Sequence, residues 1–246
     1  MIETASVYWF DEIDSTSEEA KRRAKRGDID PVWIAAKSQT LGRGRLGRSW
    51  VSPVGNLYTT VLFPEPGGFE IASRIPFAAA LAIRDIVRIA CSGLAVELKW
   101  PNDVRVRGQK LCGILTETGT ANGVVWIALG MGINIAHAPS DLAQKATSLR
   151  AEGAPEDIQV ETLLDHLRPA LSRRLLQARG AFERTLSDWT ASAEGLGKPM
   201  VAGPKGHRSE GVFQGLANDG ALILRLSDNS IRTIRAGEVD LIKQVR

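Results

Sequence analysis

The glycine pattern Gly42-x-Gly44-x-x-Gly47 limits the fold of this 246-residue chain more than any other stretch does. In a dinucleotide-binding fold, the same spacing opens a helix whose N-terminus receives a pyrophosphate. Here the following segment, GNLYTTVLF (55–63), is rich in β-branched and aromatic residues and therefore predicts a strand. The pattern thus predicts a glycine-rich loop between two strands and excludes a dinucleotide-binding helix.

The same loop carries Arg43, Arg45 and Arg48 and ends at Trp50. Each guanidinium is a planar set of donors that suits carboxylate or phosphate oxygens. Arginines held close together repel one another by about 1 kcal/mol per pair in water, so a bound anion would stabilise the loop. We predict that the loop is mobile when empty and orders over a multiply charged ligand. A solvated basic loop is the alternative that the pattern leaves open.

Hydrophobic periodicity predicts strands mixed with helices up to a domain boundary near residue 193. Helices are expected over 15–27, 71–91 and 160–189, the first with a capping box formed by Ser15 and Glu18. Short alternating segments separated by NDG and SDN turns follow the sequence SAEGLGKP, and they predict a small all-β barrel over residues 193–246.

Composition excludes several classes of protein. The two cysteines and three scattered histidines show no metal-ligand spacing, so a metal site built from protein ligands alone is not predicted. The N-terminal residues contain no apolar run, which predicts no signal peptide. The uncharged stretch 118–140 contains four glycines and a proline, and it indicates strands and a turn rather than a membrane span. We expect a cytoplasmic protein whose net charge of +3 does not call for nucleic acid.

Two further motifs point to a site for a nucleotide. KWPNDV (99–104) places Lys99, Asn102 and Asp103 at the end of a strand, and Lys110 lies on the return strand of the expected hairpin. Taken alone, these motifs would indicate an ordinary turn and a surface lysine. Together with the arginine loop, they predict cations for phosphate groups and a carboxylate able to hold Mg²⁺.

Four motifs in this order resemble those of the biotin protein ligases: GRGRLGRSW, KWPNDV, KLCGILTET and GMGINI. The segments NDGALILR and GEVDLI are similar to the SH3-like C-terminal barrel of that family. The resemblance implies an α+β catalytic domain over residues 1–192, a mixed sheet with helices of the class II synthetase-like kind found in biotin and lipoate ligases. It also implies the reaction: biotin and MgATP give biotinyl-5′-AMP, and biotin then passes to a lysine of a biotin carboxyl carrier protein, that of acetyl-CoA carboxylase or a related carboxylase.

The resemblance also implies roles for individual residues. Four polar residues are expected beside the biotin ring: Ser15, Thr16, Ser17 and Gln39. Loop residues are expected to close over biotin and the adenylate: Gly42, Arg43, Gly44, Arg45 and Arg48. Residues on the nucleotide side would be Arg43, Arg45, Arg48, Lys99, Asn102, Asp103 and Asn134. Lys110 would contact the biotin carboxylate, with Arg45 and Asp103 as the other catalytic residues, while Gly113 and Gly132 would keep space free.

Some assignments stay open at this stage. Trp50 is either the aromatic residue beside adenine or a packed tryptophan, and Asp103 is a candidate both for Mg²⁺ and for the base of the transfer step. Ser17 stands where many family members have asparagine, and Leu46 where others often carry a basic residue. Because only six residues precede Val7, we expect no DNA-binding domain and no DNA partner. A homodimer through an exposed edge strand is left open.

Two rival interpretations remain. Lipoate protein ligases share the fold and the chemistry but carry a different glycine loop and lack the KWPND motif. A nucleic-acid-binding module would explain the basic loop, yet the aromatic residues are not interleaved with the basic ones except at Trp50.

Overall fold

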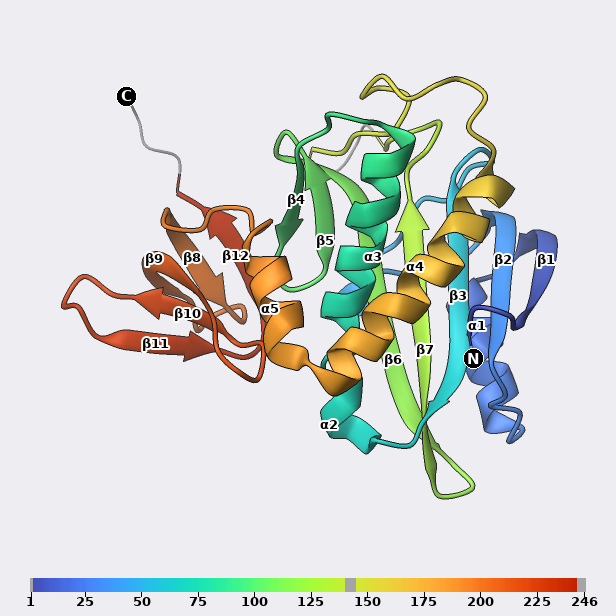
Figure 1. The fold of residues 1–246 in the computed structure, drawn as a ribbon, viewed down its shortest axis with the longest axis horizontal. Coiled ribbons are helices and arrows are strands. Elements are labelled where there is room, and N and C mark those ends of the chain that lie inside the picture. The colour runs from blue at the N-terminus through green and yellow to red at the C-terminus, as the bar shows by residue number, and fades with distance from the viewer. Residues whose placement is uncertain (1, 140–144, 243–246) are drawn as a thin grey trace.

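A seven-stranded mixed sheet forms the larger part of the computed structural model, which describes residues 2–139 and 145–242 (Figure 1). Its strands, in spatial order, are β1 (Ser6–Ile13), β2 (Val32–Gln39), β3 (Leu57–Glu65), β7 (Val124–Ile133), β6 (Gln109–Ala121), β5 (Asp103–Val106) and β4 (Val96–Lys99). β1 and β2 run parallel, and the other neighbours are antiparallel. The predicted mixed sheet is confirmed, and the glycine pattern lies between β2 and β3 rather than before a long helix.

Helices cover both faces of this sheet. The helices α3 (Ile75–Ala90) and α4 (Val160–Gly180) lie on one face, and α1 (Thr16–Lys25) lies on part of the other (Figure 1). In β2, Trp33 and Ala35 join the core on the α3 side, whereas Val32 and Ile34 join a smaller core with Ala20 of α1. Successive strand residues point to opposite faces, so the continuous apolar run of β2 serves both cores.

Two predicted helices are each broken in two. The helix expected over 71–91 consists of α2 (Gly68–Ala72) and α3, whose first turn contains Pro76, a position where proline is tolerated. The helix expected over 160–189 consists of α4 and α5 (Phe182–Thr190), separated by Ala181 at φ −148° and ψ 63°. This break allows Phe182 to pack against Phe77, with ring centroids 5.9 Å apart. Apolar residues continue at helical spacing across both breaks, so periodicity did not reveal them.

The capping box expected at the start of α1 is also wrong. Ser15 has the extended backbone of an N-cap residue, but its side chain makes no capping hydrogen bond. The carboxylate of Glu18 lies 2.8 Å from Lys21 Nζ and 2.8 Å from Arg43 Nη1. One partner within the helix, Lys21, and one tertiary partner, Arg43, therefore replace the local bond that the spacing predicts.

The C-terminal domain is all-β, as predicted. Its five strands are β8 (Pro199–Gly203), β9 (Ser209–Leu216), β10 (Leu222–Arg225), β11 (Ile231–Ile234) and β12 (Glu238–Leu241), in the order β11-β10-β9-β8-β12. All neighbouring pairs are antiparallel. Phe213 and Leu224 belong to the same buried cluster as α3, and Trp100 Nε1 donates a hydrogen bond of 3.1 Å to the carbonyl of Gly220. The domain thus packs directly on the larger one, and a boundary near residue 193 stays a prediction.

The connection between the two domains is tied to strand β4. The amide of Leu98 donates to the carbonyl of Ser192 at 2.7 Å, and the amide of Glu194 donates to the carbonyl of Leu98 at 2.9 Å. Arg105 Nη1 lies 2.8 Å from both carboxylate oxygens of Glu194, and both side chains are largely buried. Across the described ranges, no helix has the length and apolar character needed to cross a membrane.

We expect Glu194→Gln to lower the free energy of unfolding by about 2 kcal/mol, because the amide cannot balance the buried charge of Arg105. Urea unfolding followed by circular dichroism measures this, with the exposed residue Glu210 changed to glutamine as the control. A loss below about 0.5 kcal/mol, the usual size of a surface change, would contradict the structural role of the pair.

Candidate functional site

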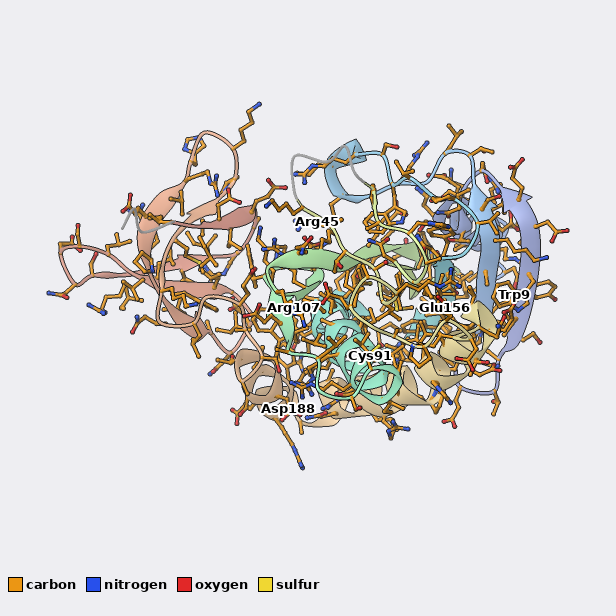
Figure 2. All side chains as sticks on the ribbon, turned by 90° about the horizontal axis from the view of Figure 1, so that it is seen from above. Trp9, Arg45, Cys91, Arg107, Glu156 and Asp188 are labelled. Atoms are coloured by element: carbon orange, nitrogen blue, oxygen red, sulfur yellow. The ribbon has the colours of Figure 1, made fainter. Side chains whose placement is uncertain are left out.

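A pocket of about 450 Å³ lies on the face of the sheet that α1 covers only in part. Tyr58 of β3 and Gly130 and Gly132 of β7 line it, while the alternate residues of these strands point into the α3 core. The arginine loop, the turn between β4 and β5, and strand β12 of the C-terminal domain complete the walls. Figure 2 shows Arg45 above the central strands, between the C-terminal domain and the N-terminal part of the chain.

Most of the predicted site residues meet in this pocket. Those that line it are Ser15, Ser17, Gln39, Arg43, Gly44, Arg45, Arg48, Trp50, Lys99, Asn102, Asp103, Lys110 and Gly113. Three others do not line it: Thr16, Gly42 and Asn134. Asn134 is buried and donates from Nδ2 to the carbonyl of Thr147 at 3.0 Å. Asn134 therefore helps to hold Thr147, whose amide in turn donates a hydrogen bond to the carbonyl of Lys110. Contact between Asn134 and a nucleotide stays a prediction.

One end of the pocket is polar without a net charge. The Thr60 hydroxyl lies 2.8 Å from the Thr16 hydroxyl and 3.2 Å from that of Ser17. Gln39 Oε1 accepts a 2.9 Å bond from the amide of Thr16, and Gln39 Nε2 donates to Ser52 Oγ at 2.9 Å. Buried hydroxyls and an amide held in this way suit a neutral ligand that carries both donors and acceptors.

Lys110 and Asp103 meet in the pocket, as the two motifs predict. Lys110 Nζ lies 2.7 Å from Asp103 Oδ1 and 5.3 Å from the centre of a Trp50 ring. The backbone of Lys110 is held as well, because its amide donates to the carbonyl of Lys145 and its carbonyl accepts from the amide of Thr147, both at 2.9 Å. The ammonium group is thereby fixed in position before any ligand binds.

Two glycines make room for Trp50 above the sheet. Gly113 of β6 and Gly132 of β7 are directly paired across the strands. A Cβ atom on Gly132 would lie 2.6 Å from Trp50 Nε1, and one on Gly113 would lie 3.0 Å from the Trp50 ring. Trp50 is therefore packed against the sheet and also lines the pocket, so neither of its two predicted roles is excluded.

We expect Gly132→Ala to displace Trp50, because the added methyl group overlaps the indole ring. In the reaction that the family resemblance implies, this change should raise the KM for biotin and the KM for ATP about ten-fold. Steady-state kinetics and Trp fluorescence measure the two effects. Gly123→Ala is the matched control: Gly123 lies in the β6–β7 turn with nothing near its added Cβ. Since Gly123 has a positive φ, some loss of stability is expected there, but no change in KM.

Two cations of the pocket are only partly neutralised. Burial lowers the pKa of Lys99, and its nearest carboxylate oxygen, Asp240 Oδ1, lies 3.7 Å away. Burial also lowers the pKa of Arg45, whose Nη1 donates to the neutral Asn102 Oδ1 at 2.9 Å. A buried or half-buried cation with no carboxylate in hydrogen-bonding contact favours the approach of an anionic ligand.

The other two loop arginines already have carboxylate partners. Arg43 Nη1 lies 2.8 Å from Glu18 Oε1, and Arg48 forms an ion pair with Glu238 of the C-terminal domain. The protein itself therefore neutralises two of the three arginines, so the repulsion within the loop is smaller than the sequence alone implies, and stabilisation by a bound anion stays a prediction. Mobility of the empty loop stays a prediction.

Sequence reasoning missed the contribution of the C-terminal domain to the pocket. Glu238, Val239 and Asp240 of β12 line the pocket, and no local pattern connects them with motifs more than 100 residues earlier. Tyr58 and Gly130 were also missed, although strand alternation would have found them. Both lie on the same face as residues that the motifs single out.

Known families and structures are similar to the chain over nearly its whole length. The model of the biotin/lipoate A/B protein ligase family matches residues 9–134, and that of the biotin protein ligase C-terminal domain matches residues 200–242. The biotin–[acetyl-CoA-carboxylase] ligase of Paracoccus denitrificans is 39% identical over 220 residues, which cover 86% of this chain and 91% of that protein. The Mycobacterium tuberculosis protein of the same name is 34% identical over 239 residues, covering 92% and 85%.

A solved structure agrees with these matches. Biotin protein ligase from Aquifex aeolicus, in complex with biotin and ATP, superposes with a TM-score of 0.82 at 27% identity, over 97% of this chain and 99% of that one. The matches cover the catalytic motifs and the C-terminal domain alike, and the second family model is specific to biotin protein ligases. The chain therefore belongs to the biotin protein ligase family.

Proposed function

We propose that the pocket binds biotin and MgATP together, forms biotinyl-5′-AMP and pyrophosphate, and passes biotin to a lysine of a biotin carboxyl carrier protein. As a member of its family, the chain is a biotin–[acetyl-CoA-carboxylase] ligase. The observation that carries the mechanism is the convergence of Lys110, Arg45 and Lys99 on one pocket whose far end is neutral and polar. The neutral end suits the ring of biotin, and the cations suit its carboxylate and the phosphates.

In the first step, a carboxylate oxygen of biotin attacks the α-phosphorus of ATP, and the bond from that phosphorus to the pyrophosphate oxygen breaks. Two anions must approach each other for this to happen. Lys110 lines the same pocket as the neutral and the cationic residues, so its ammonium group would neutralise the carboxylate and the growing charge on the phosphoryl oxygens. Arg45 and Lys99 hold the phosphate side, and their charges are effective because Lys99 is buried and Arg45 is half-buried.

The donor groups of the pocket fit Mg²⁺ that arrives with ATP. This ion is usually held by one or two carboxylates together with phosphate oxygens and water. Asp103, Glu238 and Asp240 all line the pocket, and Asp103 is largely buried. Within the described part of the chain, no cluster of three or more metal-binding side chains exists, so phosphate oxygens must complete the shell. When bound, Mg²⁺ supplies positive charge at the departing pyrophosphate, and Asp103 is the residue that we propose to hold it.

In the second step, the amine of the acceptor lysine attacks the carbonyl carbon of the adenylate, and AMP leaves. The ammonium group of that lysine must first lose a proton. Among the described residues that line the pocket, Asp103 is the one carboxylate contributed by residues 1–192. We therefore propose Asp103 as the proton acceptor, with Lys110 held beside it to balance its charge.

Partners and compartment are part of the same proposal. The acceptor is a carrier domain that inserts a lysine through the mouth of the pocket. Edge strand β1 exposes Tyr8 and Trp9, and Figure 2 shows Trp9 at this outer edge of the sheet. Pairing of two copies along the edge would form a homodimer. Cys91 and Cys112 are unpaired and buried, which fits the reducing, ATP-containing cytoplasm.

Biotin-dependent exchange of labelled pyrophosphate into ATP tests the proposal. The assay uses the purified chain with Mg²⁺, with lipoate and no-acid samples as controls. We expect exchange with biotin alone. Exchange with lipoate would favour the rival acid, and no exchange from a folded protein would overturn the proposed mechanism.

A further inference from the structure

Glu18 of α1 holds the arginine loop from outside the pocket. Its side chain is 23% exposed, does not line the pocket, and lies 2.8 Å from both Arg43 Nη1 and Lys21 Nζ. The carboxylate occupies the position from which it would cap α1, yet it turns to the loop instead. Ser15, the partner it would have in a capping box, is left free to line the pocket.

A balanced group of four charges surrounds this contact. Lys21 Nζ also lies 2.8 Å from Glu117 of β6, so two carboxylates face two cations. Three of the four residues belong to α1 and β6, which are packed elements of the larger domain. Arg43 is the one member that comes from the loop. The ion pair with Glu18 therefore connects the loop to a rigid part of the protein.

Backbone hydrogen bonds within the loop link the position of Arg43 to that of Arg45. It is a small hairpin in which Arg43 and Ser49 are paired, the amide of Gly44 donates to the carbonyl of Arg48 at 2.7 Å, and the amide of Trp50 donates to the carbonyl of Gly42 at 2.9 Å. Arg43 lies in the stem of this hairpin. Holding the stem fixes where the next residues extend, including Arg45, whose side chain bonds to Asn102 on the opposite side of the pocket.

We propose that Glu18 is a positioning residue that keeps the arginine loop closed through its ion pair with Arg43, and that it thereby slows the escape of the activated intermediate. The inference rests on the proposed function of the pocket. Under this inference, Arg45 and Arg43 have different roles. Arg45 faces a neutral partner and is available to the ligand, whereas Arg43 is occupied by a protein carboxylate and fastens the loop.

The test compares Glu18→Gln with Glu19→Gln. Glu19 is the matched control because it lies in the same helix and all its ion pairs, with Arg22, Arg23 and Arg26, stay within α1 and its C-cap. Two quantities are measured: pyrophosphate exchange, which reports formation of the adenylate, and the release of preformed radiolabelled adenylate after dilution. We expect Glu18→Gln to speed release about five-fold, the upper end of the effect of a partly exposed ion pair, with exchange unchanged. Glu19→Gln should change neither quantity.

A double-mutant cycle separates a fastening role from a general loss of structure. If the pair acts as one unit, release from the double variant Glu18→Gln/Arg43→Gln should be no faster than from the faster single variant. Higher salt should speed release from the wild type and have a smaller effect on Glu18→Gln. If Glu18→Gln proves unstable by thermal unfolding, Glu18→Asp keeps the charge with a shorter reach and should show an intermediate release rate.

Each outcome bears on one claim. Release from Glu18→Gln at the wild-type rate, while the wild type still exchanges pyrophosphate, would overturn the inference and leave the proposed function standing. Fully additive effects in the cycle would overturn it too, because Glu18 and Arg43 would then act separately. If the wild type itself showed no pyrophosphate exchange, that result would contradict the proposed function rather than the role of Glu18.

Discussion

Lys110→Ala is expected to reduce biotin-dependent pyrophosphate exchange about a thousand-fold, which is the effect of removing a fixed charge from the centre of a developing anion. Lys110 Nζ is held between Asp103 and Trp50, and its backbone is bonded on both sides to residues 145–147. No other ammonium group among the described residues occupies this position. The loss should appear in kcat as well as in the KM for biotin, since the charge acts on both the bound and the reacting carboxylate.

Two controls make this result interpretable. Lys145→Ala removes an exposed lysine whose carbonyl, not its side chain, bonds to Lys110, so activity should be retained. Lys110→Arg keeps the charge but changes the donor geometry, and it should recover only part of the activity. Circular dichroism must show that Lys110→Ala is folded, because Asp103 loses its partner. A folded variant within ten-fold of wild-type exchange would refute the role of Lys110.

Arg45→Ala is expected to speed release of the adenylate about a hundred-fold, which corresponds to the loss of a charge-assisted contact in a desolvated site. Arg45 extends from the loop hairpin to Asn102 and closes that side of the pocket. Without it, the intermediate loses both a contact and part of its cover from water. Formation of the adenylate should fall less than its retention does.

The measurement is biotinylation of a bystander protein that carries exposed lysines, together with direct release of labelled adenylate. Arg107→Ala is the matched control, because Arg107 is an exposed arginine in the β5–β6 turn that does not line the pocket. Unchanged retention in Arg45→Ala would remove the physical reason for placing an arginine at this position of the loop.

Much of the fold and the centre of the site could be predicted because the relevant contacts are local. Lys110 meets Asp103 across a short hairpin, and strand pairing brings residues a few positions apart face to face. The apolar run of β2 and the glycine-rich loop after it likewise have simple local signatures. The family motifs lie within these segments, so the resemblance and the physical interpretation converge on the same residues.

The two kinds of incorrect prediction, the capping box of α1 and the unbroken long helices, have a common physical cause. Ser15 and Glu18 have the spacing of a capping box, yet Glu18 forms an ion pair with Arg43, which lies 25 residues further along the chain. Periodicity runs through Ala181, yet the helix breaks there and Phe182 packs against Phe77. In each case a local preference worth about 1 kcal/mol or less gave way to a tertiary contact that local spacing does not encode.

The sequence by itself determined the class of fold, the position of the arginine loop between two strands, and the grouping of Lys110 with Asp103. Each depends on residue type and spacing within a short segment. Only the tertiary structure decided which carboxylates take Arg43 and Arg48, and that Glu238 and Asp240 of the C-terminal domain complete the pocket. A charged side chain accepts any opposite charge within reach, so its partner is decided by how distant elements pack, and the packing of α1, the loop and β12 brings these carboxylates to the site.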